Sequence, residues 1–543
     1  MKQRKTMLLS ILLIITMLFS GCTFQPEVKD EERKSYVLTE DLLITLQNTE
    51  FTEPKNVIYM IGDGMGENII QATQKKYENE LYQNQLSMNY LTKLGTHSSY
   101  SSSDKITDSA AGGTALASGK KTSNYTVGMN ADHTENYKSV LELAAEKGKS
   151  TGIIATKAVT DATPAAFTAH VEDRKMQNAI AKQQLEKIVD GSLDLVLGGG
   201  SEYYEYFDNE TVFEEAEAKG MHYSKIWEET SKGQLPLVGL FASDALNTTA
   251  PNIPSLAQMT ELALTLLSED ENGFFLMVEG SQIDTRAHDN TLDKQMHEVY
   301  QFDCAITVAM EFMAKHPDTV LIVTADHETG GLYFPQEGYS EDGPYVYLSD
   351  DHTSINVPVY ALGYGTNQLG EIMENTDIAG FVAGLLGETD FAQKSVVTKI
   401  YDGEESGNLY PSMDKNHPAM EMLTPTLSAK MEGIQNARAI HVVMHNGGED
   451  KQTSPALKIY TKDGSFYDVV SQYAYINPGE TLILTYILPV ELWQNNALSN
   501  VNSILMTADS VSDNAWKSTF GYVEETIALE LLEISITDRG LEN

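Results

Sequence analysis

Carboxylates, imidazoles and one serine follow the apolar runs of this sequence. The run 57–61 is followed by Asp63, the run 274–278 by Glu279, and the run 320–323 by Asp326 and His327. In α/β folds, bound molecules and ions lie beyond the carboxyl ends of the strands. Zn²⁺ is bound by imidazole nitrogen and carboxylate oxygen, whereas Mg²⁺ is bound by oxygen alone. These positions therefore predict a metal site, although in any single loop Asp and Gly also serve simply as turn residues.

Two further groups of the same type strengthen this prediction. Asp284 and His288 are four residues apart, so a helix would place both on one face, and His352 follows two aspartates in a later loop. Burying like-charged carboxylates side by side is costly unless cations offset the repulsion. The whole set is therefore better explained by bound metals than by turns.

The serine is Ser109, within the small-residue run 107–115. Such a run at the start of a helix lets backbone N–H groups approach an anion, so Ser109 is a candidate nucleophile that a metal would activate. Serine is also a common N-cap residue, which is the structural alternative. Arg174 could clamp two phosphate oxygens, or it could be an ordinary surface arginine.

The elements that would position these residues indicate an α/β fold. From residue 54 to 387, continuous apolar runs alternate with helical stretches, and the runs are 57–61, 152–155, 193–197, 274–278, 320–323 and 357–361. Unbroken apolar strands indicate burial on both faces. We expect a doubly wound, mostly parallel sheet with helices on both faces.

The pattern changes beyond residue 387. Residues 388–425 are polar and predict a linker, and 426–543 contain β-rich runs separated by turn residues, which predict an antiparallel β-sandwich-like accessory domain. Trp493 and Trp516 in that domain are expected in its core, and a cell-surface ligand such as cell-wall sugar is the alternative role.

The N-terminus has the pattern of an export signal. Residues 1–21 combine Lys2, Arg4 and Lys5 with a short apolar run and end before Cys22 in a sequence that resembles a bacterial lipobox. We expect Cys22 to be lipidated, with 22–53 as a polar tether, so that the protein is a membrane lipoprotein facing outside the cytoplasm. Cleavage and secretion is the alternative, and Cys304 is expected to be a buried, inert thiol.

Charge excludes one class of partner. The chain has 37 Lys+Arg against 78 Asp+Glu, a formal net charge of −41. Nucleic-acid binding is not expected, because such a surface repels a polyanion.

Taken together, these motifs resemble the bacterial alkaline phosphatases over residues 54–387. The resemblance rests on IGDGMG, TDSAAGGTA, DATPAA, HVEDR, VEGSQID followed by a histidine, TADHETGG and the late His352, in that order. It implies two Zn²⁺ and one Mg²⁺. By resemblance, the first zinc would be held by Asp284, His288 and His352, the second by Asp63, Asp326 and His327, and magnesium by Asp63, Thr163 and Glu279.

The resemblance also implies a reaction. Ser109 would attack a small phosphomonoester to form a phosphoseryl enzyme, with Arg174 binding the phosphoryl oxygens, and a homodimer is the expected assembly. Asp161 matches a position near the magnesium. Family members carry Lys, His or Trp directly after the aspartate matched by Asp284, whereas this chain has Thr285 and then Arg286. We expect Arg286 to substitute in part.

Two other classes of function stay open. Relatives in the same superfamily act on diesters, phosphonates or sulfates, but they usually have another nucleophile and lack the pair matched by Glu279 and Thr163. The second class is a non-catalytic surface lipoprotein that binds metal or phosphate. The intact set of ligands argues against the latter.

Overall fold

The computed structural model describes residues 36–333, 345–370 and 372–392, and beyond 392 it describes the strands and short segments named below. The predicted signal with Cys22, and also Trp493 and Trp516, lie outside the described residues. Within the described part of the chain, no helix combines the length and the apolar character needed to cross a membrane.

One sheet of ten strands organises the N-terminal part of the chain, in the order β14-β2-β13-β8-β1-β7-β3-β4-β6-β5. The strands are β1 (Asn56–Gly62), β2 (Thr92–Ser98), β3 (Ser150–Ala158), β4 (Leu195–Gly199), β5 (His222–Ser224), β6 (Leu237–Leu240), β7 (Phe274–Gly280), β8 (Thr319–Thr324), β13 (Val357–Leu362) and β14 (Ile372–Glu374). The segment from β8 to β5 is parallel throughout, and β13 runs antiparallel to both β8 and β2. The predicted α/β class is confirmed.

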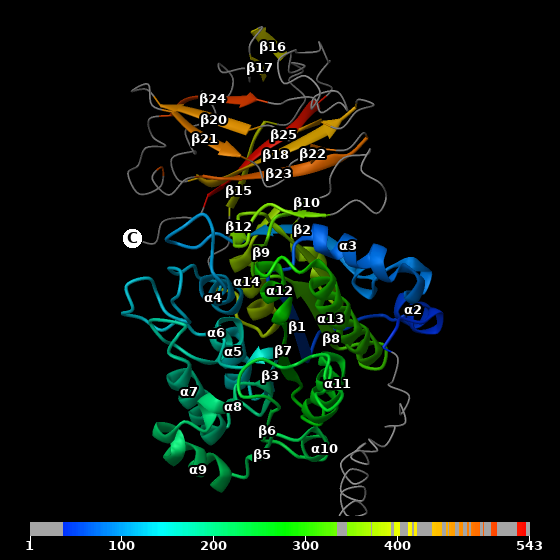
Figure 1. The fold of residues 1–543 in the computed structure, drawn as a ribbon, viewed down its shortest axis with the longest axis vertical. Coiled ribbons are helices and arrows are strands. Elements are labelled where there is room, and N and C mark those ends of the chain that lie inside the picture. The colour runs from blue at the N-terminus through cyan, green and yellow to red at the C-terminus, as the bar shows by residue number, and fades with distance from the viewer. Residues whose placement is uncertain are drawn as a thin grey trace, which may run out of the picture. The chain divides into compact units, whose positions relative to one another are not determined.

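Helices cover both faces of this sheet (Figure 1). Alternate residues of the central strands point to opposite faces. Tyr59 and Ile61 of β1 pack in one buried cluster with side chains of α4, α5, α6, α7 and α14, whereas α11 and α13 contact β7 on the other face. The helices are α2 (Glu40–Gln47), α3 (Glu67–Tyr77), α4 (Ser109–Ser118), α5 (Val140–Glu146), α6 (Ala162–Thr168), α7 (Gln177–Asp190), α8 (Ser201–Tyr204), α9 (Glu210–Ala218), α10 (Trp227–Thr230), α11 (Leu256–Leu267), α12 (Gln282–His288), α13 (Leu292–Met313) and α14 (Asn375–Leu385).

Short paired strands hold together the loop segments between β8 and β13. They are β9 (Glu328–Thr329), β10 (Leu332–Tyr333), β11 (Val346–Tyr347) and β12 (His352–Thr353). β9 pairs with β12 and β10 with β11, both antiparallel. The pairing of β9 with β12 brings the loop after β8 next to the loop that carries His352.

The C-terminal part is built of antiparallel strands, as predicted. These are β15 (Val396–Tyr401), β16 (Pro411–Asp414), β17 (His417–Met420), β18 (Ala437–Asn446), β19 (Gln452–Thr453), β20 (Ala456–Thr461), β21 (Phe466–Val470), β22 (Tyr475–Ile476), β23 (Thr481–Ile487), β24 (Val501–Thr507) and β25 (Leu529–Asp538). One sheet has the order β15-β25-β18-β23 and another β16-β17-β24-β20-β21.

The segment expected to be a linker contributes to these sheets. β15, β16 and β17 all lie within residues 388–425. β15 pairs with β25, β16 pairs with β17, and β17 pairs with β24. The polar composition of this segment concealed its strands. The domain boundaries themselves stay a prediction.

Glu142 links three elements through a partly buried carboxylate. Its Oε1 accepts from Lys187 Nζ at 2.6 Å and from His170 Nε2 at 2.9 Å, and its Oε2 accepts from the backbone N–H of Ser139 at 2.8 Å. Burial alone would raise the pKa of Glu142, but the contacts with His170 and Lys187 lower it to about 2.

This carboxylate predicts a pH dependence of stability. A depressed carboxyl pKa contributes stability above the unfolded-state pKa, and that contribution is lost as the pH falls toward the folded-state value. We expect Glu142→Gln to lower the free energy of unfolding by up to about 3 kcal/mol at pH 6. The difference from wild type should shrink as the pH falls from about 4.5 toward 2.

The measurement is urea unfolding of both proteins from pH 6 to pH 3. Glu146→Gln is the control in the same helix, because Glu146 pairs with the half-exposed Lys138 and is itself 55% exposed. A Glu142→Gln effect that stays constant over this pH range would contradict the prediction.

Candidate metal and phosphate site

Three parallel strands bring the predicted ligands to one edge of the sheet. In the register of β1 with its two neighbours, Ile61 lies beside Glu279 of β7 and beside Thr324 of β8. Asp63 comes two residues after Ile61, just beyond β1, and Asp326 comes two residues after Thr324, just beyond β8. The side chains at these three strand ends therefore meet, as expected for the carboxyl edge of a parallel sheet.

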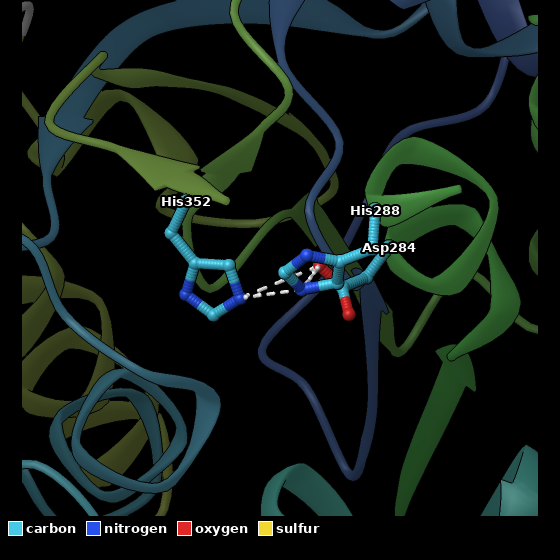
Figure 2. Close-up of side chains that lie close together, drawn as sticks. All are labelled: Asp284, His288 and His352. Atoms are coloured by element: carbon cyan, nitrogen blue, oxygen red, sulfur yellow. Dashed lines mark hydrogen bonds and ion pairs between the residues drawn. The ribbon is translucent and has the colours of Figure 1, made fainter. Parts of the chain in front are cut away.

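The first group consists of Asp284, His288 and His352 (Figure 2). Asp284 and His288 lie one turn apart on α12, and His352 comes from β12. His288 Nε2 is 3.3 Å and His352 Nε2 is 3.5 Å from Asp284 Oδ1, and the two nitrogens are 3.2 Å apart. Three ligand atoms of the kinds that zinc prefers thus converge on one point.

Both imidazoles of this group are held by backbone carbonyls. His288 Nδ1 donates to Asp350 O at 2.6 Å, and His352 Nδ1 donates to Thr107 O at 2.8 Å. A donor bond at Nδ1 leaves the lone pair of Nε2 free to bind a metal, which is the usual arrangement of a ligating histidine. The orientation of these two rings therefore fits a metal site.

The second group surrounds His327, which is fully buried. His327 Nε2 lies 3.5 Å from Asp63 Oδ1 and 3.3 Å from Asp326 Oδ2. Ligand atoms of Asp63, Asp284 and His327 all lie within 4.8 Å of one another, so Asp284 faces both groups. All residues assigned to the zinc ions by resemblance are brought together, although their division between the two ions stays a prediction.

The electrostatics of these carboxylates fits bound cations. Burial, and then the charges of Asp326 and Asp284, raise the pKa of Asp63 well above its usual value, and burial raises the pKa of Asp326 to about 6. Asp63 Oδ1 is buried and accepts no hydrogen bond from any residue that the structure describes. An unpartnered buried carboxylate oxygen is costly, so this atom is suited to binding a cation.

Glu279 and Thr163 supply oxygens beside the second group. Glu279 is buried at the end of β7, where burial raises its pKa to about 8, and it accepts a hydrogen bond from the Ser281 hydroxyl at 2.5 Å. The Thr163 hydroxyl lies 3.5 Å from Asp326 Oδ2. Oxygen donors alone fit Mg²⁺, and the assignment of magnesium to them stays a prediction.

Ser109 is the first residue of α4 and is buried at the site. Its Oγ is 3.2 Å from His327 Nε2, and the preceding Asp108 caps the helix by accepting from Ala111 N at 3.0 Å. Gly112 lets this helix come close to the loop after β8, because a Cβ there would lie 3.0 Å from the carbonyl oxygen of Asp326. The predicted nucleophile thus lies next to the second group of ligands.

Arg174 is held between two carboxylates. It donates through one terminal nitrogen to Asp108 Oδ2 at 3.1 Å and through the other to Asp161 Oδ1 at 3.0 Å. Asp108 adjoins Ser109, so the guanidinium is fixed near the nucleophile. Two of its five N–H groups are used in this way, and the others stay available for phosphoryl oxygens.

Besides Arg174, a second cation reaches Asp161, and it was not identified from the sequence. Arg286 donates to Gln282 Oε1 at 2.6 Å and lies 4.0 Å from Asp289, while Thr285 accepts from the backbone N–H of Asp289. Lys157 Nζ instead lies 2.7 Å from Asp161 Oδ2. Its position four residues before Asp161 was the available signal.

We expect loss of His352 to weaken zinc binding selectively. In His352→Asn one of the three ligand atoms of the first group is removed, and the affinity of one zinc should fall by more than about 100-fold, beyond the effect typical of an outer-shell partner. The measurement is zinc content after equilibrium dialysis at buffered free zinc.

His316→Asn is the control, since His316 stacks on Phe312 of α13 and contacts none of these ligands. Equal zinc retention by the two variants would contradict the assignment of His352.

Comparison with known proteins shows which family the chain matches. Residues 54–348 match the family described as alkaline phosphatase. Alkaline phosphatases 3 and 4 of Bacillus subtilis are 37% and 40% identical over 53% of this chain each, and the chain spans 63% and 64% of their lengths, just under two thirds. Alkaline phosphatase of Escherichia coli is 31% identical over 64% of this chain and 90% of its own length.

A solved structure agrees with this match. The alkaline phosphatase from the Antarctic bacterium TAB5 superimposes with a TM-score of 0.56 at 30% identity, covering 62% of this chain and 99% of that one. The ligands at the ends of β1, β7 and β8, together with Ser109 and Arg174, lie within the matched range, and His352 lies just beyond it. The chain belongs to the alkaline phosphatase family.

Proposed function

We propose that this chain is a metal-dependent phosphomonoester hydrolase that forms a phosphoseryl intermediate at Ser109 and releases inorganic phosphate. The observation that carries this proposal is the position of Ser109 Oγ, which lies 3.2 Å from His327 Nε2 at the start of α4. A hydroxyl at a helix N-terminus, beside a group of metal ligands and near a clamped arginine, is suited to attack phosphorus. Family membership supports the same reaction.

We further propose that the two groups of ligands hold two Zn²⁺ and that Glu279 and Thr163, together with Asp63, hold one Mg²⁺. When bound, such cations act as Lewis acids that favour ionisation of a nearby hydroxyl and stabilise charge on the leaving oxygen. The mixed imidazole and carboxylate donors support zinc, and the oxygen-only donors support magnesium.

Residues of the chain orient the phosphoryl group. The free N–H groups of Arg174 bind two of its non-bridging oxygens, while Asp108 and Asp161 keep the guanidinium plane fixed. In the first turn of α4 the Ala111 N–H donates to Asp108, and the N–H groups of Ser109 and Ala110 are left to face the same anion. These contacts strengthen as charge spreads over the oxygens in the transition state.

The reaction then consists of two displacements. The Ser109 hydroxyl gives up its proton to solvent and its Oγ attacks phosphorus, the bond from phosphorus to the alkoxide of the substrate breaks, and the alkoxide takes a proton from solvent and leaves as an alcohol. Water next loses a proton and attacks the phosphoserine, the bond from phosphorus to Ser109 Oγ breaks, Ser109 Oγ takes up a proton, and phosphate leaves. Each step inverts phosphorus, so the overall configuration is retained.

The test is phosphate release from an aryl phosphate monoester between pH 6 and 10. We expect activity that disappears on chelation, returns with zinc plus magnesium, and falls by at least about 1,000-fold in Ser109→Ala. Ser201→Ala is the control, because Ser201 is a buried serine at the start of α8 outside the site.

A zinc-loaded wild type that hydrolyses an aryl diester or sulfate faster than the monoester would overturn the substrate class. No turnover of any of these by metal-loaded protein would overturn the enzymatic proposal as a whole.

We also propose that the protein is exported and anchored through lipidated Cys22, as the lipobox-like sequence ending at that residue suggests. Cys22→Ala should then move the protein from the membrane fraction to the medium or the soluble fraction, and wild type should incorporate labelled fatty acid. Unchanged fractionation of the variant, with no label in wild type, would refute lipid anchoring.

A further inference from the structure

Four alternating charges form a continuous chain beside Ser109. Lys157 Nζ lies 2.7 Å from Asp161 Oδ2, Asp161 Oδ1 accepts from Arg174 at 3.0 Å, and Arg174 donates to Asp108 Oδ2 at 3.1 Å. The four residues come from the end of β3, the N-cap of α6, the loop before α7 and the N-cap of α4. The chain of charges therefore connects the sheet to the helix of the nucleophile.

These groups are shielded from water. The side chains of Lys157, Asp161, Arg174 and Asp108 are 23%, 18%, 20% and 12% exposed. Ion pairs that are partly buried and share hydrogen bonds are stronger than exposed pairs. The proximity of Asp161 also raises the pKa of Lys157 above its ordinary value although burial opposes this, so the ammonium stays charged.

Asp161 divides its carboxylate between two cations. Its Oδ1 accepts from Arg174 and from the backbone N–H of Ala162, while its Oδ2 faces Lys157. Without the ammonium, Oδ2 would lose its partner, and Arg174 would be the one side-chain cation that still attracts the carboxylate of Asp161. The guanidinium would then turn toward Asp161 and away from a bound phosphoryl group.

The charge balance leads to the same consequence. The four linked side chains, two cations and two carboxylates, have no net charge as a group. Removing the ammonium leaves one net negative charge next to the place where a phosphate dianion would bind. Like charges in a partly desolvated site repel, so phosphate affinity should fall.

We propose that Lys157 is a positioning residue that sets the phosphate affinity of the site by holding Asp161 and, through it, Arg174. This rests on the proposed function. Lys157 thus takes the role that the sequence had suggested for Arg286, whose guanidinium donates to Gln282 and lies near Asp289.

The experiment compares Lys157→Met, Lys157→Arg, Asp161→Asn and the double variant Lys157→Met/Asp161→Asn, all loaded with zinc and magnesium. The measurements are kcat, KM for an aryl phosphate, the inhibition constant of inorganic phosphate, calorimetric binding of phosphate, and Tm. Asp161→Asn keeps a side-chain oxygen able to cap α6. Lys187→Met is the matched control, because Lys187 is 16% exposed and pairs with Glu142 at 2.6 Å outside the site.

We expect Lys157→Met to raise KM and the inhibition constant of phosphate by about tenfold, with a smaller change in kcat. Lys157→Arg should restore most of the affinity. Lys187→Met should lower Tm to a similar extent and leave both constants unchanged. In the Asp161→Asn background, adding Lys157→Met should change phosphate inhibition by less than about twofold, because the positioning contact is already lost.

Each contrary result has a defined meaning. An inhibition constant in Lys157→Met within about twofold of the Lys187→Met value, in an active protein, overturns the role of Lys157 and leaves the proposed function standing. A full tenfold effect that persists in the Asp161→Asn background means that Lys157 acts on phosphate directly, and overturns positioning. If wild type neither binds phosphate nor hydrolyses the monoester, the proposed function fails and this inference fails with it. Should Lys157→Met not fold, Lys157→Gln takes its place.

Discussion

Repulsion among buried carboxylates is the constraint on which the rest of this site depends. Asp63, Glu279 and Asp326 meet at the ends of three adjacent strands, and burial together with their neighbours raises the pKa of each. Imidazoles, backbone N–H groups and hydroxyls surround them but leave one oxygen of Asp63 without a hydrogen bond. Bound cations would stabilise such a cluster in its ionised form, so the proposed metal binding would be coupled to the local fold.

The parallel sheet assembles this cluster from short segments of the chain. Parallel strands place residues that are far apart in the sequence at one edge, and single short elements then complete the site: one turn of α12, the start of α4 and the small strand β12. Gly112 favours the close approach of α4, since a Cβ there would lie only 3.0 Å from the carbonyl oxygen of Asp326. Rigid elements therefore carry most of the ligands, which favours a preorganised site.

Much of this arrangement could be predicted from the sequence, because it follows from local rules. Strand ends are visible as apolar runs that stop at a carboxylate, and the spacing of Asp284 and His288 places both on one helix face. The pairing of Lys157 with Asp161 was missed although their spacing of four residues was visible, since the choice of an ion-pair partner also depends on how the chain leaves β3 and on where Arg174 arrives from elsewhere. The strands β15 and β17 within 388–425 were missed for a similar reason: their partners β25 and β24 lie far along the chain.

The placement of β25 has a consequence for the order of events during synthesis. This strand comes from residues 529–538, yet it lies inside its sheet, between β15 and β18, rather than at an edge. β15 and β18 therefore emerge from the ribosome long before the strand that joins them, and until then each has an unpaired edge. Completion of this sheet is a late, long-range step, so until synthesis is finished β15 and β18 are exposed to association with other chains.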